Sequence, residues 1–226
     1  MIRALRRALH ILSIALITAG AVILIDVGLT LAWKEPLSTV YGSIQQGKAE
    51  DSLRELEQSF LDLPQARAAV AEDDARKQID QLADAFADEV ETGQGIGRIE
   101  IPTIGLDTVV VQGTDTATLR KGPGHYPETA FPGQDRTIGI AGHRTTYLAP
   151  FRPINEIEKG DEVVLDMPYG TFTYEVEGDE VVDPYQLEIV DDVGYERLVL
   201  TACHPLYSAA QRWAVFARLS DEQPVE

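Results

Sequence analysis

The sequence predicts a mostly β protein, namely an eight-stranded barrel that is preceded by a transmembrane helix and a helical stalk. Three observations predict it: an apolar run over residues 8–33, two helical apolar stripes between residues 49 and 91, and eight short β-rich runs after Gly97. Eight short strands in about 125 residues favour a closed or nearly closed barrel, because closure removes exposed strand edges. A β-sandwich is the alternative architecture.

The first element is an apolar segment over residues 8–33. At about 1.5 Å per residue, a helix of this length crosses a hydrocarbon core of about 30 Å. Arg3, Arg6 and Arg7 precede the segment, and positive flanks stay in the cytoplasm. We therefore expect cytoplasmic residues 1–7 and a single-pass cell-membrane protein whose C-terminal body is extracellular. A cleaved signal peptide is the alternative, but the length of the run favours an uncleaved signal anchor.

Residues 34–96 are predicted to form a helical juxtamembrane stalk. Pro36 ends the apolar segment, and Pro64 starts a second stalk helix, because proline suits the first turn of a helix but breaks its interior. The glycine-rich stretch over residues 92–97 marks the boundary of a C-terminal domain that comprises residues 97–226. Two apolar stripes at helical spacing support the stalk helices: Leu53, Leu56, Phe60 and Leu63, then Ile79, Leu82, Phe86 and Val90.

The C-terminal domain shows short runs rich in β-branched residues in place of the helical period. Thr171–Val176 alternates polar and apolar side chains, which is typical of a strand with one buried face. Turn-forming Gly and Pro residues separate the runs. The predicted strands are Arg98–Ile101, Thr108–Gln112, Thr137–Ala141, Glu162–Met167, Thr171–Val176, Glu180–Val182, Arg197–Ala202 and Arg212–Leu219.

The charge balance excludes one class of partner. The whole chain carries a net charge of −18 at pH 7, although its first 34 residues hold four basic side chains and one acidic side chain. The body is therefore strongly acidic and repels phosphate groups, so we expect no nucleic-acid partner. The chain holds one cysteine and can form no internal disulfide. In an extracellular domain a lone thiol is either a buried spectator or a reactive group.

That cysteine, Cys203, follows the apolar predicted strand Arg197–Ala202 and opens toward a loop. A cysteine nucleophile needs an acid/base partner for its own proton and for the leaving group. Of the four histidines, His10 falls in the apolar segment, and His204 points to the opposite face of an extended strand from its neighbour Cys203. His125 and His143 remain, and the residues alone do not choose between them.

Arg212 is the candidate for stabilising an oxyanion. The nine residues 203–211 join the predicted strands Arg197–Ala202 and Arg212–Leu219. If these strands pair as an antiparallel hairpin, Cys203 and Arg212 lie at the same end of it. The alternative is that Arg212 is an exposed charge at a strand edge.

At these residues the sequence resembles the sortase family, and it is most similar to the class E housekeeping sortases of high-GC Gram-positive bacteria. Three motifs carry the resemblance: GPGHYPETAFPGQ at residues 122–134, AGHRTTYLAPF at 141–151 and LTACHPLYSAAQRWAVFARL at 200–219. The family's Thr-Leu-x-Thr-Cys motif is incomplete here, because Val199 and Ala202 replace its two threonines.

The resemblance implies an eight-stranded sortase-type barrel that works as a cysteine transpeptidase, without a cofactor or a metal. It implies Cys203 as nucleophile, His143 as acid/base and Arg212 as the group that holds the oxyanion or the signal backbone. Tyr126 matches a tyrosine associated with accepting alanine at the second position of the sorting signal. The substrate-binding residues that the resemblance implies are Tyr126, Arg144, Thr201, Ala202 and His204.

The implied reaction begins when Cys203 attacks the Thr–Gly peptide carbonyl of a C-terminal sorting signal such as Leu-Pro-x-Thr-Gly or Leu-Ala-x-Thr-Gly. A thioacyl enzyme forms and the C-terminal fragment leaves. An amine of a peptidoglycan precursor then resolves the thioester. The implied partners are therefore surface proteins that bear a sorting signal, and the cell-wall precursor that supplies the amine.

Other cysteine enzymes remain as alternatives. A membrane-anchored cysteine hydrolase would use the same thiol and imidazole with water as acceptor. A pilus-polymerising sortase commonly carries an Asp-Pro-aromatic lid near its N-terminus, whereas that tripeptide occurs here only at residues 183–185. An L,D-transpeptidase would place its cysteine in a Ser-His-Gly-Cys context, which this sequence lacks. The acidic residues between 179 and 192 could hold calcium, but no spaced ligand loop is evident.

Overall fold

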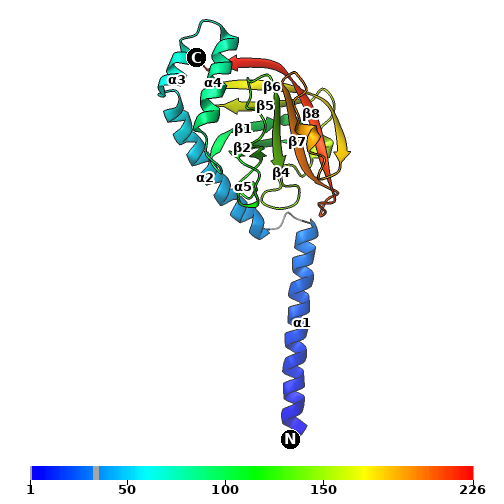
Figure 1. Cartoon of the computed structure of the whole chain (residues 1–226). Coiled ribbons are helices and arrows are strands. Elements are labelled where there is room, and N and C mark those ends of the chain that lie inside the picture. Colours follow the sequence, from blue (N-terminus) through cyan, green and yellow to red (C-terminus); the bar gives the residue numbers. More distant parts are fainter. Residues whose placement is uncertain (1, 33–35, 226) are drawn as a thin grey trace.

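The computed structural model describes residues 2–32 and 36–225. A long helix, α1 (Ile2–Ala32), extends away from a body in which helices cover the outside of a β-barrel (Figure 1). In these two ranges, no helix has both the length and the hydropathy that crossing a membrane requires. The predicted membrane span over residues 8–33 is therefore not confirmed, and its last residue, Trp33, lies outside the described residues.

Three helices connect α1 to the barrel: α2 (Pro36–Phe60), α3 (Pro64–Val70) and α4 (Ala75–Glu89). The prediction that Pro64 starts a helix is confirmed, because it is the first residue of α3. The side chain of Asp74 caps α4 by accepting hydrogen bonds from the backbone N–H groups of Arg76 and Lys77. α2 begins at Pro36, well before the predicted apolar stripe that starts at Leu53.

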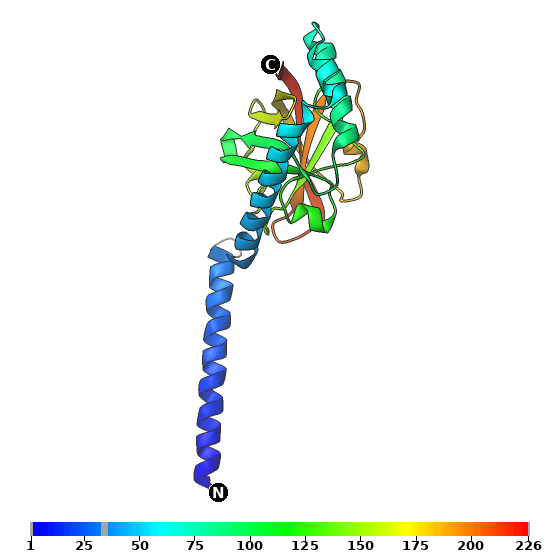
Figure 2. The same ribbon diagram turned by 90° about the vertical axis from the view of Figure 1, so that its left-hand side faces the viewer.

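The predicted stalk over residues 34–96 does not stand apart from the barrel. α2 runs along the outside of the barrel (Figure 2), and its residues Leu56 and Phe60 are buried in the same apolar core as the strands. Leu53 packs with Val109 and Val111 on the barrel surface. Most residues of the apolar stripes are buried, and both neighbouring helices and strands distant in sequence cover them.

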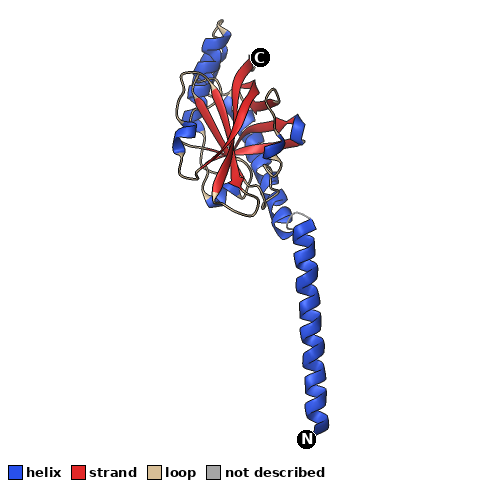
Figure 3. Ribbon diagram, turned by 90° about the vertical axis from the view of Figure 1, so that its right-hand side faces the viewer, coloured by secondary structure: helices blue, strands red, loops and turns tan. Residues whose placement is uncertain are grey.

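The strands form one closed barrel with the order β1-β2-β3-β4-β7-β8-β6-β5, which excludes the sandwich (Figure 3). β6 merges two predicted strands, because the chain continues through a register shift near residue 177. β3 was not predicted, because two residues carry no periodic pattern. The strands are β1 (Gly95–Ile101), β2 (Leu106–Gln112), β3 (Gly124–His125), β4 (Thr137–Gly142), β5 (Glu162–Met167), β6 (Gly170–Val182), β7 (Arg197–His204) and β8 (Gln211–Pro224).

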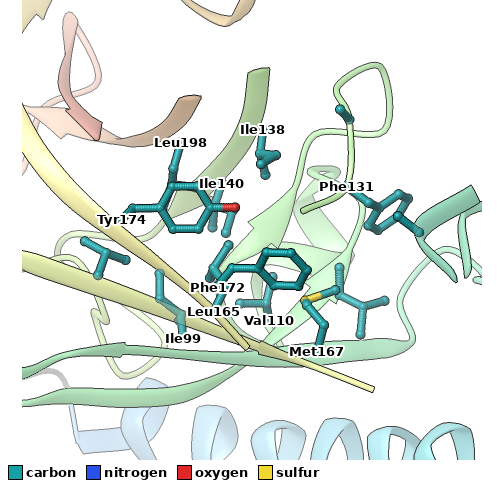
Figure 4. Packing of buried hydrophobic residues seen from close by; sticks show 14 of the residues in the cluster. Ile99, Val110, Phe131, Ile138, Ile140, Leu165, Met167, Phe172, Tyr174 and Leu198 are labelled. Atoms are coloured by element: carbon teal, nitrogen blue, oxygen red, sulfur yellow. The ribbon is translucent and has the colours of Figure 1, made fainter. Parts of the chain in front are cut away.

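The barrel interior is filled by side chains that alternate inward along each strand. Figure 4 shows Phe172 and Tyr174 of β6 beside Ile138 and Ile140 of β4, and all four are at most 2% exposed. The core extends past the barrel into the helices through aromatic contacts: the ring of Phe86 lies 5.3 Å from that of Phe60 and 5.1 Å from that of Tyr169. Helices and barrel therefore share one core.

Candidate active site

Three adjacent strands bring the predicted catalytic residues to one end of the barrel. β4 and β7 are parallel, and their last paired residues are Gly142 and Ala202. The residues that follow them in sequence are His143 and Cys203. β7 and β8 are antiparallel, and Cys203 pairs directly with Arg212. The predicted hairpin is therefore present, and the order β4-β7-β8 places the thiol between the imidazole and the guanidinium.

The three side chains line one cavity of about 210 Å³. Tyr126, Thr201 and Ala202 also line it, as do Thr114 and Leu119 from the segment around the short helix α5 (Thr116–Leu119). Cys203 is partly exposed, so a substrate carbonyl can reach its sulfur from the cavity. The contribution of Thr114 and Leu119 was not predicted, since neither residue carries a distinctive chemical group.

The His143 ring is held by packing, not by hydrogen bonds to its buried nitrogen. Among the described residues, no hydrogen-bond partner lies within reach of its Nε2. The ring centroid lies 5.2 Å from that of Tyr147. Burial of the ring, and next the positive charge of Arg120, hold the pKa of His143 below its ordinary value. The neutral imidazole is therefore favoured, as a general base requires.

His125 occupies a different environment and has no free nitrogen. Its Nδ1 lies 2.8 Å from Oε1 of Gln112, and its Nε2 lies 2.8 Å from the carbonyl oxygen of Ala130. The ring stacks on Phe131 and is 2% exposed. Burial lowers the pKa of His125 to about 4. These contacts make His125 a structural residue that joins β3 to the loop after it, which leaves His143 as the histidine on the cavity.

Arg212 is partly exposed, and it lines the cavity. Its Nη1 donates to the carbonyl oxygens of Ala209 at 3.0 Å and Gln211 at 2.9 Å, so it braces the turn between β7 and β8. Its other N–H groups form no hydrogen bond with the residues that the structure describes, so they can donate to a substrate oxygen. Arg212 and Cys203 line the same cavity, and the role of Arg212 as oxyanion donor stays a prediction.

Arg144 and His204, both predicted to bind substrate, lie on the other side of Cys203. Neither Arg144 nor His204 is among the described residues that line the cavity. Arg144 is 5% exposed, and its guanidinium contacts Asn155, the carbonyl oxygen of Cys203 at 3.5 Å and Nδ1 of His204 at 3.1 Å. Arg144 is thus placed to hold the end of β7 from behind the reactive thiol.

Tyr126 and Thr201 lie on the cavity wall, with the tyrosine hydroxyl 2.9 Å from the threonine Oγ1. Together with Arg212, they also line a smaller cavity of about 30 Å³ beneath the 3₁₀ helix η3 (Leu187–Val190). The Asp183-Pro184 part of the Asp-Pro-Tyr tripeptide lines this second cavity. The two cavities share Tyr126, Thr201 and Arg212 as lining residues. In the described ranges, no three His, Cys, Asp or Glu side chains gather as a metal site.

Comparison with known proteins shows which family the chain resembles. Residues 99–220, just over half of the chain, match the family model described as a sortase domain. Sortase D of Bacillus subtilis is 36% identical over 143 residues, which cover 62% of this chain and 71% of that protein. Sortase SrtE1 of Streptomyces coelicolor is 30% identical over 150 residues, which cover 59% of this chain and 43% of that protein.

Solved structures of sortases also have a fold similar to that of this chain. Sortase E from Streptomyces avermitilis is 37% identical, with a TM-score of 0.55 over 60% of this chain and 93% of that chain. Sortase E1 from Streptomyces coelicolor, whose crystal structure has a tripeptide in the active site, is 30% identical. Its TM-score is 0.57 over 58% of this chain and 91% of that chain.

Proposed function

This chain belongs to the sortase family, whose members are cysteine transpeptidases that act on sorting signals, and we propose that it cuts a Leu-Pro-x-Thr-Gly or Leu-Ala-x-Thr-Gly signal between Thr and Gly. It then joins the Thr carboxyl group to an amine of a cell-wall precursor. One observation carries this proposal: the adjacent strands β4, β7 and β8 deliver an imidazole, a thiol and a guanidinium to a single cavity.

In the proposed acylation, neutral His143 takes the proton of the Cys203 thiol, the sulfur attacks the threonine carbonyl carbon, and the carbonyl oxygen becomes an oxyanion. Arg212 of β8 is the residue that pairs with Cys203, and its guanidinium donates a hydrogen bond to that oxygen. The carbon–nitrogen bond then breaks, and the His143 imidazolium gives its proton to the leaving glycine amine. The products are a thioester on Cys203 and the free C-terminal fragment.

Deacylation runs through the same groups in reverse order. The incoming amine attacks the thioester carbonyl, and neutral His143 removes its proton. The sulfur leaves and regains its proton from His143, and a new amide bond joins the threonine carboxyl group to the wall precursor. Burial and Arg120 favour the neutral form of His143 that this step needs.

The position of Tyr126 supports the proposal that the sorting signal binds beside the thiol. Its ring packs over Gly139 of β4, where an added Cβ would lie 2.6 Å from the ring, and its hydroxyl contacts Thr201 of β7. The tyrosine is therefore held between β4 and β7, the strands that carry the chain to His143 and Cys203. We propose that this ring forms the wall against which the second residue of the signal packs.

The proposal also places the body outside the cell, attached to the membrane through α1. Arg3, Arg6 and Arg7 precede the helix, and its apolar side chains are exposed, for example Ile17 at 71% and Leu24 at 73%. External protease on intact protoplasts tests this placement. Digestion of the body supports it, whereas protection that is lost on lysis would reverse it.

Mass spectrometry of the purified full chain in detergent tests the reaction. Peptides with the two signals are incubated with and without a small amine such as triglycine. We expect a thioacyl adduct on Cys203 and an amine-ligated product that ends at Thr, and Cys203→Ala should form neither. A product carrying only water, even with amine in excess, would instead identify a hydrolase. A Cys203→Ala chain that still transfers peptide would refute the mechanism.

A further inference from the structure

The loop that follows His143 holds an unfavourable backbone conformation. Tyr147, Leu148 and Ala149 have φ values of 50°, 68° and 46°, which places three successive non-glycine residues in the left-handed region. Each such residue costs about 1–3 kcal/mol and persists only where its surroundings impose it. Within the loop, the backbone N–H of Phe151 donates to the carbonyl oxygen of His143 at 3.1 Å. The loop conformation and the position of His143 are therefore linked.

The beginning of α2 packs against this loop. Gly42 is buried, and a Cβ at that position would lie 2.9 Å from Cγ of Leu148 and 3.1 Å from the carbonyl carbon of Tyr147. Only a glycine lets the helix backbone come so close. The preceding residue, Tyr41, meets the Tyr147 ring edge-on, with the centroids 6.0 Å apart and the planes at 66°.

Tyr147 carries these contacts to the active site. Its ring lies between Tyr41 of α2 and the His143 ring, whose centroid is 5.2 Å away, and the guanidinium of Arg120 lies 5.5 Å from its centroid. Because Nε2 of His143 has no hydrogen-bond partner among the described residues, packing of this kind orients the ring.

α2 is itself anchored to the barrel one turn after Gly42. The Gln46 side chain accepts from the Val109 N–H at 3.1 Å and the Thr108 hydroxyl at 2.8 Å. Its Nε2 donates to the carbonyl oxygens of Val109 at 3.1 Å and Lys121 at 2.5 Å. Four hydrogen bonds thus fix the helix on the barrel at the height of the His143 loop.

We propose that the first turns of α2 belong to the catalytic apparatus, with Tyr41 and Gly42 holding Tyr147, and Tyr147 acting as the positioning residue for the His143 ring. The proposal rests on the proposed function, in which His143 transfers protons. It means that the segment following α1 sets the activity of the barrel. A displacement of α2 would change the position of the His143 ring but would leave Cys203 in place.

Two glycines of α2 provide a matched test. Gly42→Ala and Gly47→Ala make the same change in helix propensity, but a Cβ at Gly47 meets nothing within 4 Å. In the full chain in detergent, we expect Gly42→Ala to lower kcat by about tenfold to a hundredfold with little change in KM, because a small misplacement of a catalytic group has that cost. Gly47→Ala should keep wild-type constants.

A second pair covers the case in which Gly42→Ala fails to fold. Tyr41 is 44% exposed, so Tyr41→Ala leaves the core intact. Tyr41→Ala should lower kcat in the same direction, whereas Tyr41→Phe keeps the ring contact and should restore it. Equal constants in Tyr41→Ala and the wild type would overturn the proposal, as would equal constants in Gly42→Ala and Gly47→Ala.

Titration of the His143 ring by NMR provides a readout that needs no turnover. Besides Tyr147, the ionisable groups around the ring are Arg120 beside α5, Cys203 on β7, Arg212 on β8 and Tyr126 before β4. If Gly42→Ala or Tyr41→Ala releases the ring toward solvent, its titration moves to higher pH. An unchanged titration in both variants would refute the proposal. If the wild type transfers no sorting peptide, the proposed function fails, but this titration still decides the role of α2.

Discussion

Arg212 of β8 pairs with Cys203 of β7. Its guanidinium donates hydrogen bonds to two carbonyl oxygens of the turn between these strands. Such a fixed donor stabilises charge that develops only during the reaction. Loss of one oxyanion donor typically costs about 10²–10³ in rate, so we expect this loss in kcat for Arg212→Ala. Arg212→Lys keeps the charge but not the planar fork, and should recover only part of the rate.

Measurement of kcat and KM for both Arg212 variants separates two roles. A raised KM with kcat preserved would show that Arg212 binds the signal in its ground state. Near-native constants in both variants would show that the oxyanion donor lies elsewhere.

The pKa of His143 gives a second prediction at this scale. Burial and the positive charge of Arg120 both lower that pKa, so the neutral base persists to lower pH than an exposed histidine would allow. Arg120→Gln removes the charge, and the pKa of His143 should rise. The acidic limb of the pH profile of kcat/KM should therefore move to higher pH.

Arg67→Gln serves as the control, because Arg67 lies on α3 at the far end of the body (Figure 1) and pairs with Asp62. Its profile should match the wild type. An acidic limb that stays in place in Arg120→Gln would mean that a group other than His143 controls it.

At the scale of the element, Glu196 fixes the start of β7. Its carboxylate is 3% exposed and accepts hydrogen bonds from the backbone N–H groups of Gly133 and Asp135 and from the Tyr174 hydroxyl. These bonds tie the loop before β4 to the strand that carries Cys203. Glu196→Ala leaves the backbone N–H groups of Gly133 and Asp135 and the Tyr174 hydroxyl without this partner, and should lower the free energy of unfolding by about 2–4 kcal/mol in urea titrations.

The same carboxyl predicts a pH dependence. Burial raises the pKa of Glu196, while its hydrogen bonds only partly oppose the shift. The contribution of Glu196 to stability is then fully present below its unfolded-state pKa and declines as the pH rises through its folded-state pKa. The difference in unfolding free energy between the wild type and Glu196→Gln should therefore be larger at pH 4 than at pH 7. A difference that grows toward pH 7 would mean that the hydrogen bonds outweigh burial.

At the scale of the whole molecule, the helices and the barrel depend on each other. Phe86 of α4 is fully buried against Phe60, Phe131 and Tyr169, so it joins the helical layer to the barrel. Phe86→Ala should lower the free energy of unfolding by about 3–5 kcal/mol. Ile44→Ala on α2 is the control, since Ile44 is 56% exposed and its loss should change stability by less than about 0.5 kcal/mol.

Urea unfolding followed by circular dichroism measures both variants. A single cooperative transition is expected, because one core spans both layers. Two transitions, with only the first affected by Phe86→Ala, would show that the barrel is stable without its helices. That result would support residue 97 as the start of an independent domain.

The sequence by itself determined the elements and much of the chemistry. Local pattern located most strands of the barrel but not the two-residue β3, because side-chain alternation and turn residues act over a few positions. The short turn from Cys203 to Arg212 made the hairpin predictable, since such strands have little choice but to pair with each other. A single cysteine at the end of an apolar strand made Cys203 the candidate for the nucleophile of a cysteine transpeptidase, the class to which the family belongs.

Only the tertiary structure decided which elements meet. The residues left His125 and His143 equivalent, and the parallel pairing of β4 with β7, some sixty residues apart in the chain, brought His143 beside Cys203. The same holds for Arg144, which packs behind the thiol, and for α2, which packs on the barrel and reaches the His143 loop. A periodic stripe shows that a face is buried, but not what covers it. Contacts between distant segments depend on how the barrel closes, which no local pattern encodes.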